Sequence, residues 1–79
     1  MKNELRAVVS KISKIPYKKI NNGTKIGPKH REVADHIATY YGVIIRDEIT
    51  AKTTFAEFAN LVERKCKERD AEFKKLLQT

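Results

Sequence analysis

The chain has 79 residues, of which 41% are hydrophobic, and it contains only three glycines and two prolines. This length suits one small domain, taken as residues 1–79, and the composition favours a compact helical core. No apolar run approaches the roughly 20 residues that span a bilayer, and charges interrupt the first residues where a signal peptide is apolar, so we expect a cytoplasmic protein without a membrane span.

Positive charge is concentrated in the first part of the chain. Residues 1–31 contain nine lysines or arginines and one acid, Glu4, whereas residues 32–79 contain eight basic and nine acidic residues. The net charge of +7 therefore arises from the N-terminal segment. Such a polarised surface suits an acidic protein, a nucleic acid or an anionic lipid. A lysine-rich face that only keeps the protein in solution explains the charge equally well.

The first predicted helix covers about residues 2–13. Its apolar residues recur at i, i+3, i+4 and i+7, which is the pattern of an amphipathic helix; they are Leu5, Val8, Val9 and Ile12. Pro16 ends this helix, and residues 16–27 form a loop with a turn at residues 21–23. We expect Ile20 and Ile26 of this loop to enter the core.

A second helix is predicted to begin at Pro28, with Gly27 as its N-cap. Val33, Ile37 and Tyr41 form its apolar stripe, and Gly42 ends it.

The segment after Gly42 is predicted to be an irregular connection with one short helical turn near residues 47–49. Thr54 and Glu57 then have the spacing of a capping box, so a last helix of about 25 residues is expected to begin there. Its apolar stripe is interrupted by a charged interval and then resumes. The first part of the stripe contains Phe55, Phe58, Leu61 and Val62, and the second contains Phe73, Leu76 and Leu77.

The order of these segments resembles the acyl and peptidyl carrier proteins over roughly residues 5–65. The similar features are the loop "KINNGTKIG", the helix "EVADHIATYYGV" and the segment "IIRDEITAKTTFAEFANLVE", whose Thr-Thr entry into the last helix is common in the family. The resemblance implies an all-α, antiparallel bundle of three long helices and one short helix. In this chain the core covers about residues 2–65, and the last helix continues as an extension over residues 66–79.

The chain differs from the carrier family at the site that defines carrier activity. In the family, a serine in Asp-Ser-Leu at the start of the second helix receives the phosphopantetheine arm; here Gly27 occupies that place when counted back from Gly42. The serines of this chain, Ser10 and Ser13, fall on the first helix. The family's second helix is also acidic, whereas this one begins with Lys29, His30 and Arg31. Conventional carrier activity is therefore not expected, although a carrier with an unconventional attachment residue is a third alternative.

The basic start of the second helix suggests an anion site. Cations cost up to about 1 kcal/mol at a helix N-terminus, where unpaired amides favour an anion, so local stability does not explain this choice of residues. One interpretation is a site for phosphate or an acidic partner, with contacts from Lys25, Lys29, His30 and Arg31. The alternative is that these side chains extend into water or pair with an acidic residue such as Asp47 or Glu48.

Other reactive residues do not form a recognisable site. Cys66 is the single cysteine, and with His30 and His36 it has no metal-ligand spacing. His36 is interpreted as an ordinary, partly buried residue, and Tyr40 as a more exposed side chain that is available for a contact. No nucleophile with a base and no nucleotide-binding loop is present. We therefore predict no enzyme activity, no metal and no cofactor.

Two functions remain from the sequence. The first is a carrier-like module that docks on a protein with an acidic surface, with a candidate protein interface, or a homodimer contact, at Phe73, Leu76 and Leu77. The second is a nucleic-acid-binding domain that uses the basic N-terminal segment. No nucleic-acid motif supports the second function beyond charge, so docking is ranked first.

Overall fold

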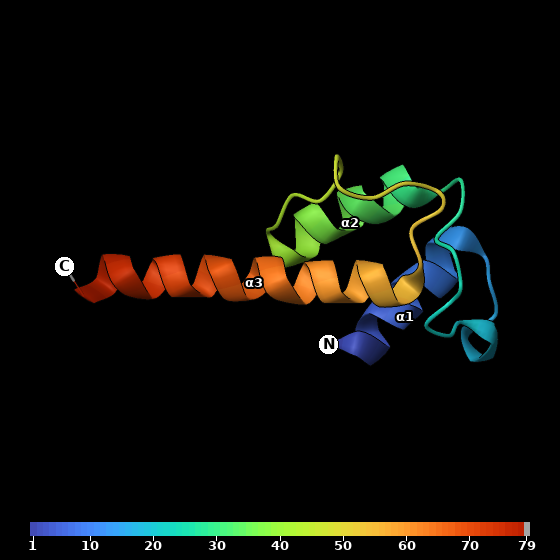
Figure 1. The fold of residues 1–79 in the computed structure, drawn as a ribbon, viewed down its shortest axis with the longest axis horizontal. Coiled ribbons are helices and arrows are strands. Elements are labelled where there is room, and N and C mark those ends of the chain that lie inside the picture. The colour runs from blue at the N-terminus through green and yellow to red at the C-terminus, as the bar shows by residue number, and fades with distance from the viewer. Residues whose placement is uncertain (79) are drawn as a thin grey trace.

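The computed structural model describes residues 1–78, and its regular structure is helical (Figure 1). The elements are α1 (Lys2–Ser13), the short 3-10 helix η1 (Tyr17–Lys19), α2 (His30–Tyr41) and α3 (Phe55–Gln78). The predicted all-α class is therefore confirmed. The short helix expected near residues 47–49 is instead a turn over residues 46–48, in which the Glu48 amide donates to the Ile45 carbonyl at 2.9 Å. No helix in residues 1–78 is long and apolar enough to span a membrane.

The three α-helices do not simply alternate in direction. α2 and α3 both begin at the end of the molecule where the loops gather, and both run away from it, whereas α1 runs towards it (Figure 1). The molecule is elongated, with extents of 46 × 22 × 18 Å. A helix of α3's 24 residues is about 36 Å long, and its second half extends beyond the rest of the molecule.

The core lies where the apolar stripes of the three helices meet. Leu5 and Val9 of α1 and Val33 and Ile37 of α2 are fully buried, as are the stripe residues Phe55, Phe58 and Val62 in the first half of α3. The connections complete the core with five further side chains, namely Ile20, Ile26, Val43, Ile45 and Ile49. Tyr41 is half-buried against this cluster, and its hydroxyl donates to the Glu4 carboxylate at 3.1 Å.

The start of α3 has the predicted capping box. The Glu57 amide donates to the Thr54 hydroxyl at 3.3 Å, and the Thr54 amide donates to the Glu57 carboxylate at 3.2 Å. Loop carbonyls accept from the next amides: Phe55 donates to Thr24 at 2.7 Å, and Ala56 donates to Asn22 at 3.1 Å. These bonds satisfy amides that a helix start leaves without intrahelical partners.

The start of α2 differs from the prediction. The helix begins at His30 with Lys29 as its N-cap, two residues later than Pro28. Gly27 has a φ of 86°, in the left-handed region that favours glycine, and its amide donates to the Ala51 carbonyl at 3.0 Å. This tertiary bond turns the chain away from a helical path, so Gly27 and Pro28 precede the helix. Gly42, with a φ of 70°, ends α2 as predicted.

Candidate interaction surfaces

The four residues of the predicted anion site have different surroundings. Lys25 lies in the loop before α2, where it forms an isolated bridge with Thr54. The Lys29 ammonium is 3.5 Å from the Glu32 carboxylate, so its acidic neighbour is Glu32 on the next turn, and not Asp47 or Glu48. A pair at i and i+3 on one helix forms locally, which explains why it takes precedence over the more distant acids.

The other two residues of the predicted anion site, His30 and Arg31, differ from each other in exposure. The half-buried His30 ring places Nδ1 3.2 Å from the Gly27 carbonyl, which fixes the ring against the turn before α2. Arg31 is exposed. Glu48, an alternative partner considered for these cations, lies 2.9 Å from the Lys65 ammonium and 4.0 Å from the Arg64 guanidinium. The structure therefore supports surface cations at Lys25, Lys29 and Arg31, with His30 in a structural role.

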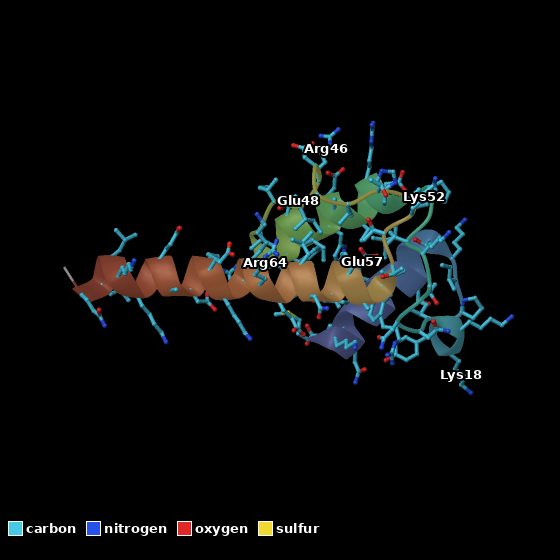
Figure 2. The ribbon with its side chains drawn as sticks, in the orientation of Figure 1. Lys18, Arg46, Glu48, Lys52, Glu57 and Arg64 are labelled. Atoms are coloured by element: carbon cyan, nitrogen blue, oxygen red, sulfur yellow. The ribbon has the colours of Figure 1, made fainter. Side chains whose placement is uncertain are left out.

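A larger group of cations lies on the loops at the same end of the molecule. Residues 14–29 and 50–54 contain six lysines and no carboxylate, whereas the rest of the chain carries eleven basic and ten acidic residues. We call these six residues the basic loop cluster: Lys14, Lys18, Lys19, Lys25, Lys29 and Lys52. Figure 2 shows Lys18 of η1 and Lys52 of the loop before α3 at this end, although they are distant in sequence. Nearly all of the net positive charge is thus on these loops.

Hydrogen bonds hold the loops of the basic loop cluster together. The Ser13 hydroxyl at the end of α1 donates to the Ile26 carbonyl at 3.0 Å, and the Thr24 hydroxyl donates to the Lys19 carbonyl at 3.2 Å. The Ile26 amide donates to the Thr53 carbonyl at 2.9 Å, which joins the loop before α2 to the loop before α3. The lysines therefore project from a connected backbone framework.

The opposite end of the molecule is formed by the second half of α3. Cys66 is the last buried residue of this helix, and residues 67–78, which we call the C-terminal arm, are all exposed. The candidate interface residues lie on this arm, where Phe73 is 60%, Leu76 is 73% and Leu77 is 71% exposed. Three large apolar side chains are therefore in water, close together at i, i+3 and i+4 spacing.

These three side chains continue the buried face of α3. Phe73 lies 18 residues after Phe55 in this helix, which is five turns at 3.6 residues per turn. In the same way, Leu76 is in phase with Phe58, and Leu77 is in phase with Ala59. The buried stripe and the exposed stripe thus point in the same direction from the helix axis, and they differ in that α1 and α2 cover only the first.

The junction between the body and the C-terminal arm is fixed by polar contacts. The Arg69 guanidinium donates to the Tyr41 carbonyl at the end of α2, and it also lies 3.2 Å from the Asp70 carboxylate. One helical turn earlier, Lys65 pairs with Glu48 in the loop after α2. Because these contacts secure α3 at the edge of the body, the arm leaves it in a defined direction.

The two serines have structural partners. The Ser10 hydroxyl donates to the Ile15 carbonyl at 2.7 Å, and the Ser13 hydroxyl donates to the Ile26 carbonyl. Both groups accordingly satisfy carbonyls around the end of α1.

The other reactive residues singled out in the sequence do not form a site. Cys66 is buried, and His36 is half-buried with its ring tilted against that of the exposed Tyr40 at a centroid distance of 4.4 Å. Residues 1–78 contain no group of three potential metal ligands.

Two titratable groups have altered pKa values with structural causes. Hydrogen bonds from the Thr54 amide and hydroxyl lower the pKa of Glu57 from its ordinary value of 4.5. Burial, together with the hydrogen bond to the Glu4 carboxylate and the charge of that group, raises the pKa of Tyr41. Glu57 caps the start of α3, and Tyr41 joins α2 to α1. The two groups do not form a reactive pair.

Comparisons with protein-family models, curated proteins and solved structures found no match for this chain. The resemblance to carrier proteins is therefore a hypothesis that rests on the sequence pattern.

Proposed function

We propose that the chain is a non-catalytic docking module with a carrier-like helical fold, which inserts its C-terminal arm into an apolar groove of a partner protein. The observation that carries this proposal is the continuation of α3's buried stripe onto a part of the helix that the body does not cover. A helix that presents anchors at i, i+3 and i+4 is a common ligand for apolar grooves. The arm offers Phe73, Leu76 and Leu77 at this spacing.

The backbone at the place of the carrier serine supports a non-catalytic role. Gly27 occupies that place, its φ is 86°, and its amide is bonded to the Ala51 carbonyl. An L-amino acid with a side chain is strained in this conformation. The position therefore acts as a tertiary turn, and the hydroxyls of Ser10 and Ser13 are engaged in backbone contacts.

The apolar gain of docking is moderate. Full burial of a Leu or Phe side chain contributes about 1.5–3 kcal/mol, and the three anchors are between 60% and 73% exposed. Covering them completely therefore gives about 3–6 kcal/mol. Association itself costs about 4–15 kcal/mol, so a specific partner must also contact the flanks of the helix, as the two walls of a groove do.

A groove suits the C-terminal arm better than a second copy of the arm. The 12 residues 67–78 form a helix about 18 Å long, and two such helices packed side by side share a strip about 10 Å wide. This strip is well short of the roughly 800 Å² per partner that a stable interface buries. A groove encloses more of the same helix and so buries more surface per residue.

The experiment compares two matched double variants in a pull-down from lysate treated with nuclease. F73S/L77S removes two exposed apolar side chains from the C-terminal arm, and Y40S/I44S removes two that are similarly exposed on and after α2. We expect F73S/L77S to lose a protein that the wild type and Y40S/I44S retain. Direct titration of that purified protein should then give an affinity at least tenfold lower for F73S/L77S.

Two results would contradict the proposal. Equal capture by both variants would exclude the arm as the docking element. A concentration-dependent dimer of the wild type that F73S/L77S abolishes, without any captured protein, would assign the arm to self-association. The intact mass of the captured bait tests the carrier question separately, because a phosphopantetheine adduct would restore a carrier role.

A further inference from the structure

We infer that the basic loop cluster binds the phosphate backbone of nucleic acid without reading its sequence. This surface is at the other end of the molecule from the C-terminal arm (Figures 1 and 2). It is a second interaction surface, independent of the docking function proposed above.

The charge of the cluster is not neutralised within the protein. Lys29 pairs with Glu32, and none of the other five lysines of the cluster forms an ion pair within residues 1–78. The nearest acid at the start of α3, Glu57, is held by the amide and hydroxyl of Thr54. The loops therefore present a concentrated positive field, which attracts polyanions and increases their association rate.

The framework of the cluster reduces the cost of binding. Four segments carry its lysines: the end of α1, η1, the loop before α2 and the loop before α3. Hydrogen bonds from Ser13, Thr24 and Ile26 join these segments, so their relative positions exist before a ligand arrives. Binding then orders lysine side chains alone, without the larger cost of ordering the loops.

The composition of the surface favours nucleic acid over an acidic protein. Protein interfaces have an apolar centre and are depleted in lysine, whereas this surface is rich in lysine. Its isoleucines Ile20 and Ile26 are buried, and Ile15 is half-buried against the core. Tyr17 is the one large apolar side chain that is exposed in residues 14–29 and 50–54. The Arg6 guanidinium lies over the Tyr17 ring at 5.5 Å from its centroid, and the side chain remains 41% exposed. A lysine-rich surface with an exposed aromatic ring suits phosphate contacts together with base stacking.

The position of the lysines predicts binding that is independent of sequence. They lie on loops, in the single turn of η1 and at helix ends, and not along the exposed face of an α-helix that enters a groove. Side chains in such places contact phosphates, and phosphate contacts carry no direct sequence information. The binding should therefore depend strongly on salt. For six contacts, the slope of log affinity against log salt is about −5 on duplex DNA and about −4 on single strands.

The test measures the anisotropy of labelled duplexes and single strands of unrelated sequence as the salt concentration is raised. K18Q/K19Q/K52Q removes three charges from the basic loop cluster, and K67Q/K74Q/K75Q removes three charges from the C-terminal arm as a matched control. All six lysines are exposed and form no ion pair within residues 1–78. We expect the cluster variant to reduce the salt slope by about 2–3, and the arm variant to leave it nearly unchanged.

The comparison of duplexes with single strands, and of both with anionic vesicles and polyglutamate, distinguishes the possible ligands. Tighter binding of single strands, reduced by Tyr17→Leu, would identify base stacking at Tyr17, and equal binding of both forms would assign the contacts to phosphates alone. An equal loss of affinity in the two triple variants would overturn the inference, because net charge would then explain the binding. Tighter binding to anionic vesicles or to polyglutamate of the same charge would also overturn it. F73S/L77S should bind nucleic acid normally, which separates this test from the docking proposal.

Discussion

Phe55→Ala and Phe73→Ala remove the same side chain from the same face of α3, and we expect very different effects on stability. Phe55 is fully buried, whereas Phe73 is 60% exposed on the C-terminal arm. Truncation of a buried phenylalanine to alanine costs about 3–5 kcal/mol, because both its transfer energy and its packing are lost. An exposed substitution usually changes stability by less than about 0.5 kcal/mol, and alanine is the better helix former.

The size of the first effect is large for this protein. A chain of 79 residues has a free energy of unfolding of about 4–12 kcal/mol, so Phe55→Ala, which costs about 3–5 kcal/mol, should remove roughly a quarter of it or more. Urea denaturation followed by circular dichroism measures both variants against the wild type. The expected result is a much lower midpoint for Phe55→Ala, and an unchanged or slightly higher midpoint for Phe73→Ala.

A loss of more than about 1 kcal/mol in Phe73→Ala would refute this reasoning. It would mean that the C-terminal arm is packed in the free protein, either against its own body or against a second copy. Repeating the denaturation at several protein concentrations separates these cases, because the stability of a dimer depends on concentration. In either case, the exposed stripe would not be available for a partner.

Three further predictions concern the helix cap and the turns that position the helices. Thr54→Ala should cost about 1 kcal/mol through the lost N-cap. The pKa of Glu57 is lower in the folded chain than its ordinary value, so its contribution to stability is present above pH 4.5 and is lost as the pH falls through the lowered pKa. Glu57→Gln should therefore flatten the acid dependence of Tm. An acid dependence identical to that of the wild type would contradict this. Gly27→Ala should lose about 1–2 kcal/mol from strain at positive φ, whereas Gly23→Ala, without a positive φ, should be neutral or slightly stabilising. Chemical denaturation of both glycine variants provides the comparison.

Local patterns were sufficient to predict most of the helical fold. The periodicity of α1 and α2, the end of α2 at Gly42 and the capping box at Thr54 and Glu57 all depend on residues within a few positions of one another. The start of α2 was predicted two residues too early, because the path of Gly27 is set by a bond to Ala51, which lies on a distant loop. A sequence pattern contains no information about such a bond.

Of the two candidate surfaces, one could be predicted from local sequence spacing and the other only in part. The exposed stripe at Phe73, Leu76 and Leu77 follows from helical spacing and was therefore visible in the sequence. The sequence division at residue 31 placed the excess charge in the N-terminal segment, but it assigned Lys52 to the neutral part of the chain. Lys52 reaches the cluster because the loop before α3 bonds to the loop before α2. The charge pattern could have identified the acid-free segment 50–54, but not that the fold places it beside the loop before α2.

The helix α3 connects the two proposed interaction surfaces, the basic loop cluster and the C-terminal arm. Carbonyls of Asn22 and Thr24, from a loop of the basic cluster, accept from the first amides of α3, and the C-terminal arm is the other end of the same helix. A partner on the arm therefore leaves the cluster uncovered, and neither site needs to change for the other to be filled. Allosteric coupling requires two states of the protein that bind a ligand with different affinity. We therefore expect the binding free energies of the partner and of nucleic acid to be additive. The protein would then hold its partner beside nucleic acid at a raised effective concentration, and any preference of the pair for a particular nucleic-acid sequence must come from the partner.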